Sequence, residues 1–152
     1  MKKYTWFAIA LLVICSNFLF AKDDEAEFKD LITKYYAAWN TMKASNAASF
    51  YAQDPDLVFF DIAPIKYNGF GEYQDGAQKN FFDIATSCKL TPNNDLKVTR
   101  RGDVAWTTLT FHLSAVLKQG GTMELDGRQT SIWEKRNGKW LIVHEHISAP
   151  QQ

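Results

Sequence analysis

The chain has 152 residues, of which 46% are hydrophobic and 14% aromatic, and it carries 17 Lys and Arg against 17 Asp and Glu. This length suits one domain with a real core, and the aromatic residues supply bulk for that core. The charges of both signs are interspersed without a basic run, which argues against nucleic acid as a partner.

Residues 1–21 have the features of a secretory signal peptide. Lys2 and Lys3 form a basic start, an apolar run spans 6–14, and the small residue Ala21 stands just before an acidic segment. We therefore predict cleavage after Ala21 and a periplasmic or secreted location. The apolar run is too short for a permanent membrane span.

The mature chain is predicted to be one domain over 22–152, with 15 basic residues, 17 acidic residues and one cysteine, Cys88. A single cysteine cannot form an internal disulfide, and its place on an apolar helical stripe predicts a buried, unreactive thiol. Lipid attachment at Cys15 is the alternative to cleavage, but the bulky Ile14 stands where a lipoprotein normally has a small residue.

The first half of the mature chain predicts three helices and one strand. Apolar residues at helical spacing indicate an amphipathic helix over 24–44, and a short second helix is expected over 47–51. A strand is expected over 57–62, followed by a turn or short strand with two glycines over 67–71. The third helix is predicted over 72–88.

The second half is a run of strands. They are predicted over 96–101, 104–118, 122–136 and 139–148, and the last two are joined by Asn137-Gly138, a strong hairpin signal. Helices followed by hairpin-connected strands predict an α+β fold with an antiparallel sheet. A curved sheet wrapped over three helices would form a cone whose open mouth is a natural ligand pocket.

The strand over 104–118 shows which face of the sheet is covered. One row of alternate residues is apolar, and the other row holds polar residues together with Trp106 and His112. The apolar row is expected to meet the helices. The outer row suits a contact between two sheets, so we predict a homodimer through the outer sheet face.

Asp61 is the first catalytic candidate. It shares an apolar row with Leu57 and Phe59, where lost hydration would disfavour its charged form and tune it as a general base. The alternative is an aspartate at a strand end that is hydrogen-bonded to the following turn.

Glu145 is the second candidate. Strict alternation on the last strand places it in an apolar row with Leu141, Val143 and Ile147. A buried carboxylate needs a partner, which Arg128 or Tyr35 could supply. The alternative to catalysis is a structural ion pair that holds the last strand.

Four aromatic residues and one arginine are candidates for ligand binding. They are Trp39, Phe59, Phe111, Arg128 and Trp133. The rings could stack on a cyclic ligand or simply form the core, and the guanidinium could clamp a carboxylate or an enolate. Strict alternation places Arg128 on the same face as Thr130, and a bulge near Asp126-Gly127 would reverse it.

The histidines predict no metal site. His144 and His146 share one face under strict alternation, and His112 lies on another strand, so three imidazoles could in principle gather. We interpret them as hydrogen-bonded interface residues. The sequence also has no nucleophile elbow and no glycine-rich phosphate loop. We therefore expect neither a metal nor an organic cofactor.

The C-terminal third resembles a known group of domains. Arg128-x-Thr130 followed by GKWLIVHEHISAP over 138–150 is similar to the closing segment of SnoaL-like proteins in the nuclear transport factor 2-like superfamily. It is also similar to the end of the association domain of calcium/calmodulin-dependent protein kinase II. The arginines of that domain's anion pocket correspond here to Phe111, Ser131 and Ile147, so the resemblance does not imply an anion pocket.

The first half resembles the steroid isomerases of the same superfamily. Tyr35-x-Ala37-Ala38-x-Asn40, then Tyr51-Ala52-x-Asp54, then Asp61 follow the spacing found there. This resemblance implies that Asp61 is the general base and that Tyr35 donates to a developing enolate. No residue matches the second carboxyl of those enzymes.

Together these features predict a protein that binds a small apolar or cyclic molecule in the cone. As an enzyme it would be an isomerase, cyclase or dehydratase that acts next to a carbonyl, with Asp61, Tyr35 and Glu145 as catalytic residues. The alternatives are a non-enzymatic ligand carrier and a protein-assembly module.

Overall fold

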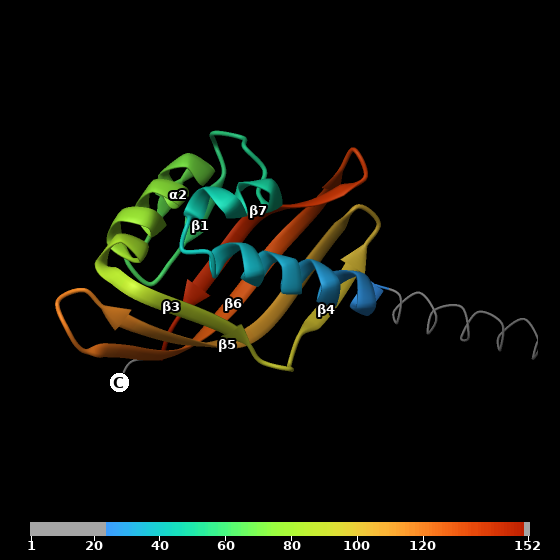
Figure 1. Cartoon of the computed structure of the whole chain (residues 1–152). Coiled ribbons are helices and arrows are strands. Elements are labelled where there is room, and N and C mark those ends of the chain that lie inside the picture. The colour runs from blue at the N-terminus through green and yellow to red at the C-terminus, as the bar shows by residue number, and fades with distance from the viewer. Residues whose placement is uncertain (1–23, 151–152) are drawn as a thin grey trace, which may run out of the picture.

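Residues 24–150 are described by a computed structural model, so the predicted signal peptide and Cys15 lie outside the described residues. A helix over 24–39 comes first. It is followed by the 3-10 helix η1 (Ala44–Phe50), by α2 (Gly69–Asn80) and by a 3-10 turn, η2 (Phe82–Ile84). These helices lie together on one side of the sheet (Figure 1).

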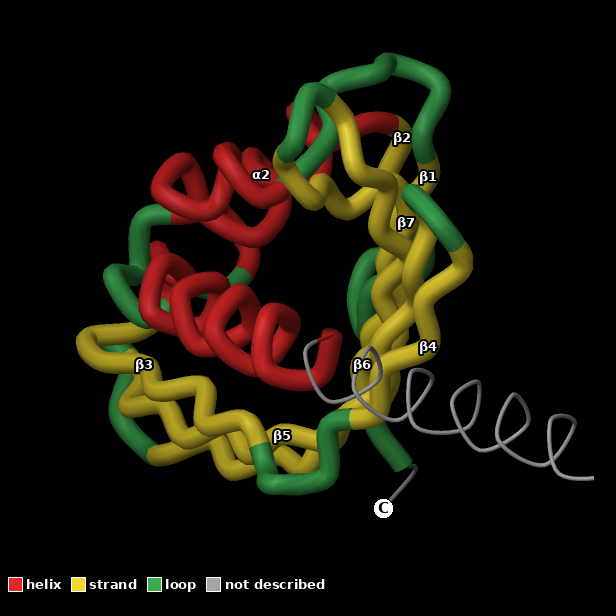
Figure 2. The backbone as a smooth tube through the Cα atoms, turned by 90° about the vertical axis from the view of Figure 1, so that its right-hand side faces the viewer, coloured by secondary structure: helices red, strands yellow, loops and turns green. Residues whose placement is uncertain are grey.

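Seven strands within residues 24–150 form one sheet. They are β1 (Val58–Phe60), β2 (Tyr67–Asn68), β3 (Ala85–Pro92), β4 (Lys97–Arg101), β5 (Val104–Leu117), β6 (Thr122–Arg136) and β7 (Lys139–Ser148). Their order is β2-β1-β7-β6-β5-β3. β3 pairs with the C-terminal half of β5, and β4 pairs with the N-terminal half of β5 along the same edge. The sheet curves around the helices without closing (Figure 2). This arrangement confirms the predicted α+β cone.

The helix over 24–39 lies across the concave face because one side of it is apolar. Phe28, Ile32, Tyr35, Tyr36 and Trp39 recur at helical spacing, and each is at most 4% exposed. A turn over 40–42 ends this helix earlier than the predicted boundary at 44.

Asn40, which follows the helix over 24–39, ties it to the sheet. Its side-chain amide donates to the carbonyl of Leu90 at 2.9 Å and its oxygen accepts from the Leu90 N–H at 2.7 Å. This reciprocal pair fixes the helix end against β3.

The third helix is shorter than predicted. α2 ends at Asn80, and residues 85–92 form strand β3, which pairs with β5. The helical spacing that predicted a helix to Cys88 is misleading here, because pairing with β5 satisfies the backbone and turns Cys88 and Leu90 toward the core. Ile84, which lies one turn before Cys88 in the predicted helix, is 41% exposed.

The sheet is mixed rather than purely antiparallel. β1 runs parallel to β7, with Phe59 opposite Glu145, whereas the other strand pairs are antiparallel. The parallel pairing is possible because a long connection, which includes α2 and strands β3 to β6, separates β1 from β7 along the chain. The predicted hairpin is confirmed: Asn137 and Gly138 join β6 to β7 with φ values of 51° and 80°.

The outer face of β5 carries the predicted mixed row. Trp106 is 40% exposed and lies opposite Ile132 on β6, which is 36% exposed, while Ala105, Leu109 and Phe111 face the helices. No helix within residues 24–150 is long and apolar enough to cross a membrane.

Candidate functional site

A cavity of about 330 Å³ lies between the helices and the concave face of the sheet. Twenty of the described residues line it, from the helix over 24–39, the loop after β1, α2, η2 and strands β2, β3, β5, β6 and β7. Eight of these residues are aromatic: Tyr35, Tyr36, Trp39, Tyr67, Tyr73, Phe81, Phe82 and Phe111. The cavity is therefore a mainly apolar, aromatic pocket of the kind that binds small molecules.

Phe111 is part of the cavity wall because its strand neighbour is a glycine. Gly127 lies directly opposite Phe111, and a Cβ atom on Gly127 would stand 2.2 Å from Cζ of Phe111. The missing side chain lets the ring of Phe111 cover the β6 backbone. Gly127 is thus required for close approach rather than for a bulge.

Asp61 lines the same cavity from the loop that follows β1. Its Oδ1 accepts a 2.7 Å hydrogen bond from the N–H of Ile62, so the predicted contact with the following turn is present as well. Burial raises the pKa of Asp61 to about 6, and the nearby charge of Glu145 acts in the same direction. A carboxyl with such a pKa can gain or lose a proton near neutral pH.

Glu145 is fully buried at the centre of a hydrogen-bonded cluster. Its Oε2 accepts from the hydroxyls of Tyr51 at 2.7 Å and Tyr73 at 3.2 Å. Its Oε1 accepts from Gln129 Nε2 at 2.7 Å and Ser131 Oγ at 2.9 Å. The hydroxyl of Tyr35 lies 3.1 Å from both oxygens. We call these six residues the Glu145 cluster.

Burial and hydrogen bonding act on Glu145 in opposite directions. Burial raises the pKa of this carboxyl, while the donors from Tyr51, Ser131, Gln129 and Tyr35 lower it. Burial, together with the charge of Glu145, also raises the pKa of Tyr35, Tyr51 and Tyr73 well above the ordinary value for tyrosine. The phenols are therefore neutral donors to the carboxylate.

The Glu145 cluster forms part of the cavity wall. Tyr35, Tyr73 and Gln129 belong to both, and Gln129 also accepts a 2.6 Å hydrogen bond from the hydroxyl of Tyr36, another lining residue. The hydroxyls of this wall are thus occupied by one another and by Glu145. A ligand in the cavity would meet mainly aromatic rings on this side.

Trp39 carries the one buried side-chain nitrogen or oxygen of the described residues that has no hydrogen-bond partner, its indole Nε1. Trp39 lines the cavity and is 4% exposed. A buried donor without an acceptor costs free energy. A ligand acceptor that reached this N–H would therefore be stabilised by it.

A bulge in β7 turns Glu145 into this site. Ile132 pairs with His144 while Trp133 pairs with Ile142, so Val143 is the extra residue. The inward row is therefore Trp140, Ile142, Glu145 and Ile147, and the predicted row with Leu141 and Val143 was wrong. The polar residues Gln129 and Ser131, which alternate inward on β6, were the sequence signal for its partners.

Three residues predicted to bind ligand do not line the cavity. Arg128 is exposed on the outer face, because strict alternation holds along β6 and no bulge occurs near Gly127. Phe59 is fully buried and stacks on Tyr73 at 5.5 Å. Trp133 is fully buried, with its Nε1 donating to Thr107 Oγ1 at 3.0 Å. The last two residues belong to the core, whereas the predicted Trp39 and Phe111 do line the cavity.

The histidines lie apart from the cavity. His112 pairs on the outer face with Glu124 and Asp126 at 2.9 and 2.8 Å, and these two acids raise its pKa. His144 is hydrogen-bonded to the carbonyl of Val58 at 2.7 Å. Residues 24–150 contain no group of three or more His, Cys, Asp or Glu that could hold a metal ion. Burial raises the pKa of the Cys88 thiol to about 11, so this thiol is a weak nucleophile.

Comparisons with known proteins agree with this fold. The SnoaL-like domain family matches residues 29–152, and no curated protein matches the chain. A nuclear transport factor 2-like superfamily protein from Salmonella enterica is 19% identical, with a TM-score of 0.78 over 86% of this chain and 94% of that chain. The likeness confirms the predicted fold.

Two further solved structures have the same architecture. A protein from Xanthomonas campestris, provisionally named a calcium/calmodulin dependent protein kinase II association domain, is 25% identical, with a TM-score of 0.70 over 83% of this chain and 87% of that chain. A hexachlorocyclohexane dehydrochlorinase is 15% identical, with a TM-score of 0.72 over 84% and 85%.

Proposed function

The chain belongs to the SnoaL-like domain family, and from that premise we propose that it binds a small, largely apolar molecule in the cavity and that Asp61 moves a proton on that molecule. The observation that carries this proposal is the position of Asp61. Its carboxyl lines an aromatic cavity and has a pKa near 6. General bases work best when their pKa lies near the working pH.

In the proposed reaction, Asp61 takes a proton from a carbon next to a carbonyl and returns it to another atom of the same molecule. Return to a second carbon gives an isomerase, and return to a departing hydroxyl gives a dehydratase. In a cyclase, the carbon that loses the proton attacks a second carbonyl carbon of the same molecule, and the proton goes to the oxygen of that carbonyl. As proposed, this proton transfer needs neither a metal nor an organic cofactor. The negative charge that develops on the carbonyl oxygen needs a donor.

We assign that donor role to Trp39 rather than to Tyr35. The hydroxyl of Tyr35 is within hydrogen-bond distance of Glu145 and Tyr51, whereas Trp39 Nε1 is without a partner among the described residues. Tyr35 and Glu145 then act as positioning residues that hold the aromatic wall in place. Neither residue needs to exchange a proton with the ligand.

A non-enzymatic carrier is the second candidate. It is favoured by the cavity wall, because the hydroxyls of Tyr35, Tyr36 and Tyr73 are hydrogen-bonded within the protein. Among the described residues, Asp61 is then the one carboxyl that lines the cavity. A carrier would bind its ligand with Asp61 as an anchor and release it unchanged.

The variant Asp61→Asn separates these two functions once the ligand is known. Native mass spectrometry of the protein purified without denaturant would identify a bound molecule by its mass. For an enzyme, Asp61→Asn should lower turnover of that molecule by roughly 100- to 10,000-fold while the dissociation constant changes little. Unchanged turnover in the variant would overturn the catalytic role of Asp61, and binding without turnover in the wild type would favour the carrier.

We further propose that the protein is exported and that it forms a dimer through the outer face of β5 and β6. Export is supported by the composition of residues 1–21, and dimerisation by the exposed pair Trp106 and Ile132. The intact mass of the protein from a periplasmic fraction tests export, since cleavage after Ala21 leaves Lys22 as the first residue.

A further inference from the structure

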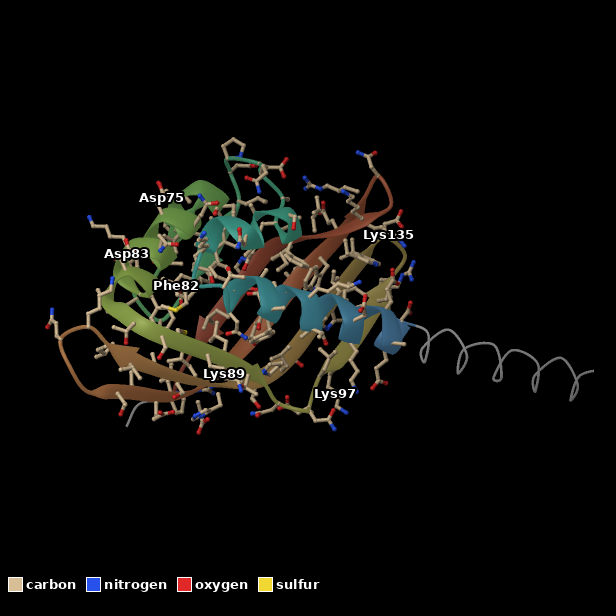
Figure 3. All side chains as sticks on the ribbon, in the orientation of Figure 1. Asp75, Phe82, Asp83, Lys89, Lys97 and Lys135 are labelled. Atoms are coloured by element: carbon tan, nitrogen blue, oxygen red, sulfur yellow. The ribbon has the colours of Figure 1, made fainter. Side chains whose placement is uncertain are left out.

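The ionisable carboxyl and basic groups at the cavity wall are acidic only, within the described residues. None of the described residues that line it is Lys, Arg or His, whereas Asp61 lines it directly and Glu145 lies behind Tyr35 and Tyr73. Figure 3 shows the labelled lysines, Lys89, Lys97 and Lys135, on the outside of the molecule.

Asp61 has no cationic partner within residues 24–150. Its described hydrogen bond comes from the uncharged N–H of Ile62, and it takes part in none of the salt bridges of the described residues. Arg100 and Arg136, in contrast, are paired with acids on the surface. A partly buried carboxylate without a counter-ion lacks the compensation that such groups normally have in proteins.

The rest of the wall suits a positive charge. Aromatic rings attract a cation within about 6 Å of their centre through their quadrupole, and Trp gives the strongest attraction. Trp39 lies in the wall beside Tyr73 and Phe82, with ring centres 5.7 and 5.9 Å apart. This protein already uses the same interaction elsewhere, because Arg100 lies 5.2 Å from the ring centre of Trp140.

We propose that the cavity takes an organic cation, a small molecule with an apolar body and one alkylated or protonated nitrogen that faces Asp61 and lies against the aromatic wall. This inference rests on the proposed ligand-binding function, with Asp61 as the anchor of the ligand, and names the class of ligand. The cation supplies the counter-charge that the described protein residues do not. An anionic ligand is repelled by the Asp61 carboxylate, and a neutral ligand leaves Asp61 uncompensated.

The test uses two probes of the same shape. Phenyltrimethylammonium is the cation, and tert-butylbenzene is the neutral molecule in which carbon replaces the nitrogen. Isothermal titration calorimetry at pH 8 and low salt measures both dissociation constants on the full mature chain. We expect the cation to bind about ten-fold or more tightly than its neutral counterpart.

Asp61→Asn locates the source of this preference, and Asp75→Asn is its matched control. Asp75 is an exposed acid on α2 outside the cavity wall, labelled in Figure 3, so its replacement changes the net charge by the same amount as Asp61→Asn. Asp61→Asn should weaken the cation by about ten-fold and leave tert-butylbenzene unchanged. Asp75→Asn should alter neither constant by more than about two-fold.

The outcomes separate the inference from the function on which it rests. Equal or tighter binding of tert-butylbenzene to the wild type would overturn the cation preference and keep the apolar cavity. Absence of binding by both probes would overturn ligand binding itself. Equal losses of cation affinity in the two variants would assign the preference to net charge and overturn the role of Asp61. The wild-type comparison decides the matter if Asp61→Asn does not fold.

Discussion

The hydroxyl of Tyr35 lies 3.1 Å from both carboxylate oxygens of Glu145. The resemblance to the steroid isomerases implies that Tyr35 donates to an oxygen of the ligand. In the structure, its hydrogen-bond partner is instead a buried carboxyl group of the protein itself. The hydroxyl of Tyr35 also lies 3.0 Å from the hydroxyl of Tyr51, so both hydrogen-bond partners of Tyr35 belong to the Glu145 cluster. The Glu145 cluster is therefore both a buried hydrogen-bonded network and a part of the cavity wall.

Glu145→Gln should destabilise the fold strongly. The amide keeps the size of the side chain but replaces one acceptor oxygen with a donor, which then faces donors from Tyr51, Gln129 or Ser131. Unsatisfied buried groups cost about 1–3 kcal/mol each, so we expect a loss of about 2–4 kcal/mol in the free energy of unfolding. Urea denaturation followed by circular dichroism measures this loss.

Glu134→Gln is the control for Glu145→Gln. Glu134 lies on the neighbouring strand, is 42% exposed and pairs with Arg136 at 2.8 Å. Removal of its charge should change stability by less than about 1 kcal/mol. Equal effects of the two substitutions would show that the Glu145 cluster contributes nothing special to stability.

Asp61 should make stability depend on pH in a defined window. The pKa of Asp61 is about 6 in the folded protein and 3.8 ordinarily. At pH values between these two, the folded state therefore binds the proton more tightly than the unfolded state does. The free energy of unfolding that Asp61 contributes therefore falls as the pH rises from about 4 to 6. Asp61→Asn should equal the wild type near pH 3.5 and exceed it by about 1–2 kcal/mol above pH 7, after allowance for solvent around this partly exposed group.

Urea denaturation at five pH values between 3.5 and 8 measures this difference, and Asp75→Asn provides the control because Asp75 is exposed. The control should run parallel to the wild type. A constant difference between Asp61→Asn and the wild type across the range would contradict a raised pKa.

Substitution by alanine should have opposite effects on stability at two glycines of α2. A Cβ on Gly76 would stand 2.2 Å from Cε1 of Tyr67, a buried lining residue, whereas a Cβ on Gly71 would meet nothing within 4 Å. Gly76→Ala should cost about 1–3 kcal/mol and disturb the cavity wall. Gly71→Ala should add about 0.5–1 kcal/mol through helix propensity. Thermal melts of both variants decide the point, and two stabilised proteins would show that Tyr67 is not packed against Gly76.

Trp106→Glu should abolish the proposed dimer. It places a charge on the outer face opposite Ile132, where an interface between two sheets would bury it. Sedimentation velocity should then show a monomer in place of the wild-type dimer. Ile65→Glu is the control, because Ile65 is 84% exposed in the loop after β1. A wild-type protein that sediments as a monomer would refute this interface.

The sequence by itself determined the strands from β4 to β7 and the outer face of β5. Residues 122–136 and 139–148 are strands with the predicted bounds, because two-residue alternation and an Asn-Gly turn are local signals that require no distant partner. The covered row of β5 follows from the same alternation. The resemblance in the C-terminal segment likewise identified the family, which the family match over 29–152 confirms.

Only the tertiary structure decided which of the candidate residues meet at the site. The bulge at Val143, which reverses the inward row before Glu145, depends on the register with β6, and register is a property of two strands. The end of α2 at Asn80 depends on the pairing of β3 with β5. The Glu145 cluster joins Tyr35, Tyr51, Tyr73 and two β6 side chains, some as far as 110 positions from Glu145, through contacts that no local pattern encodes.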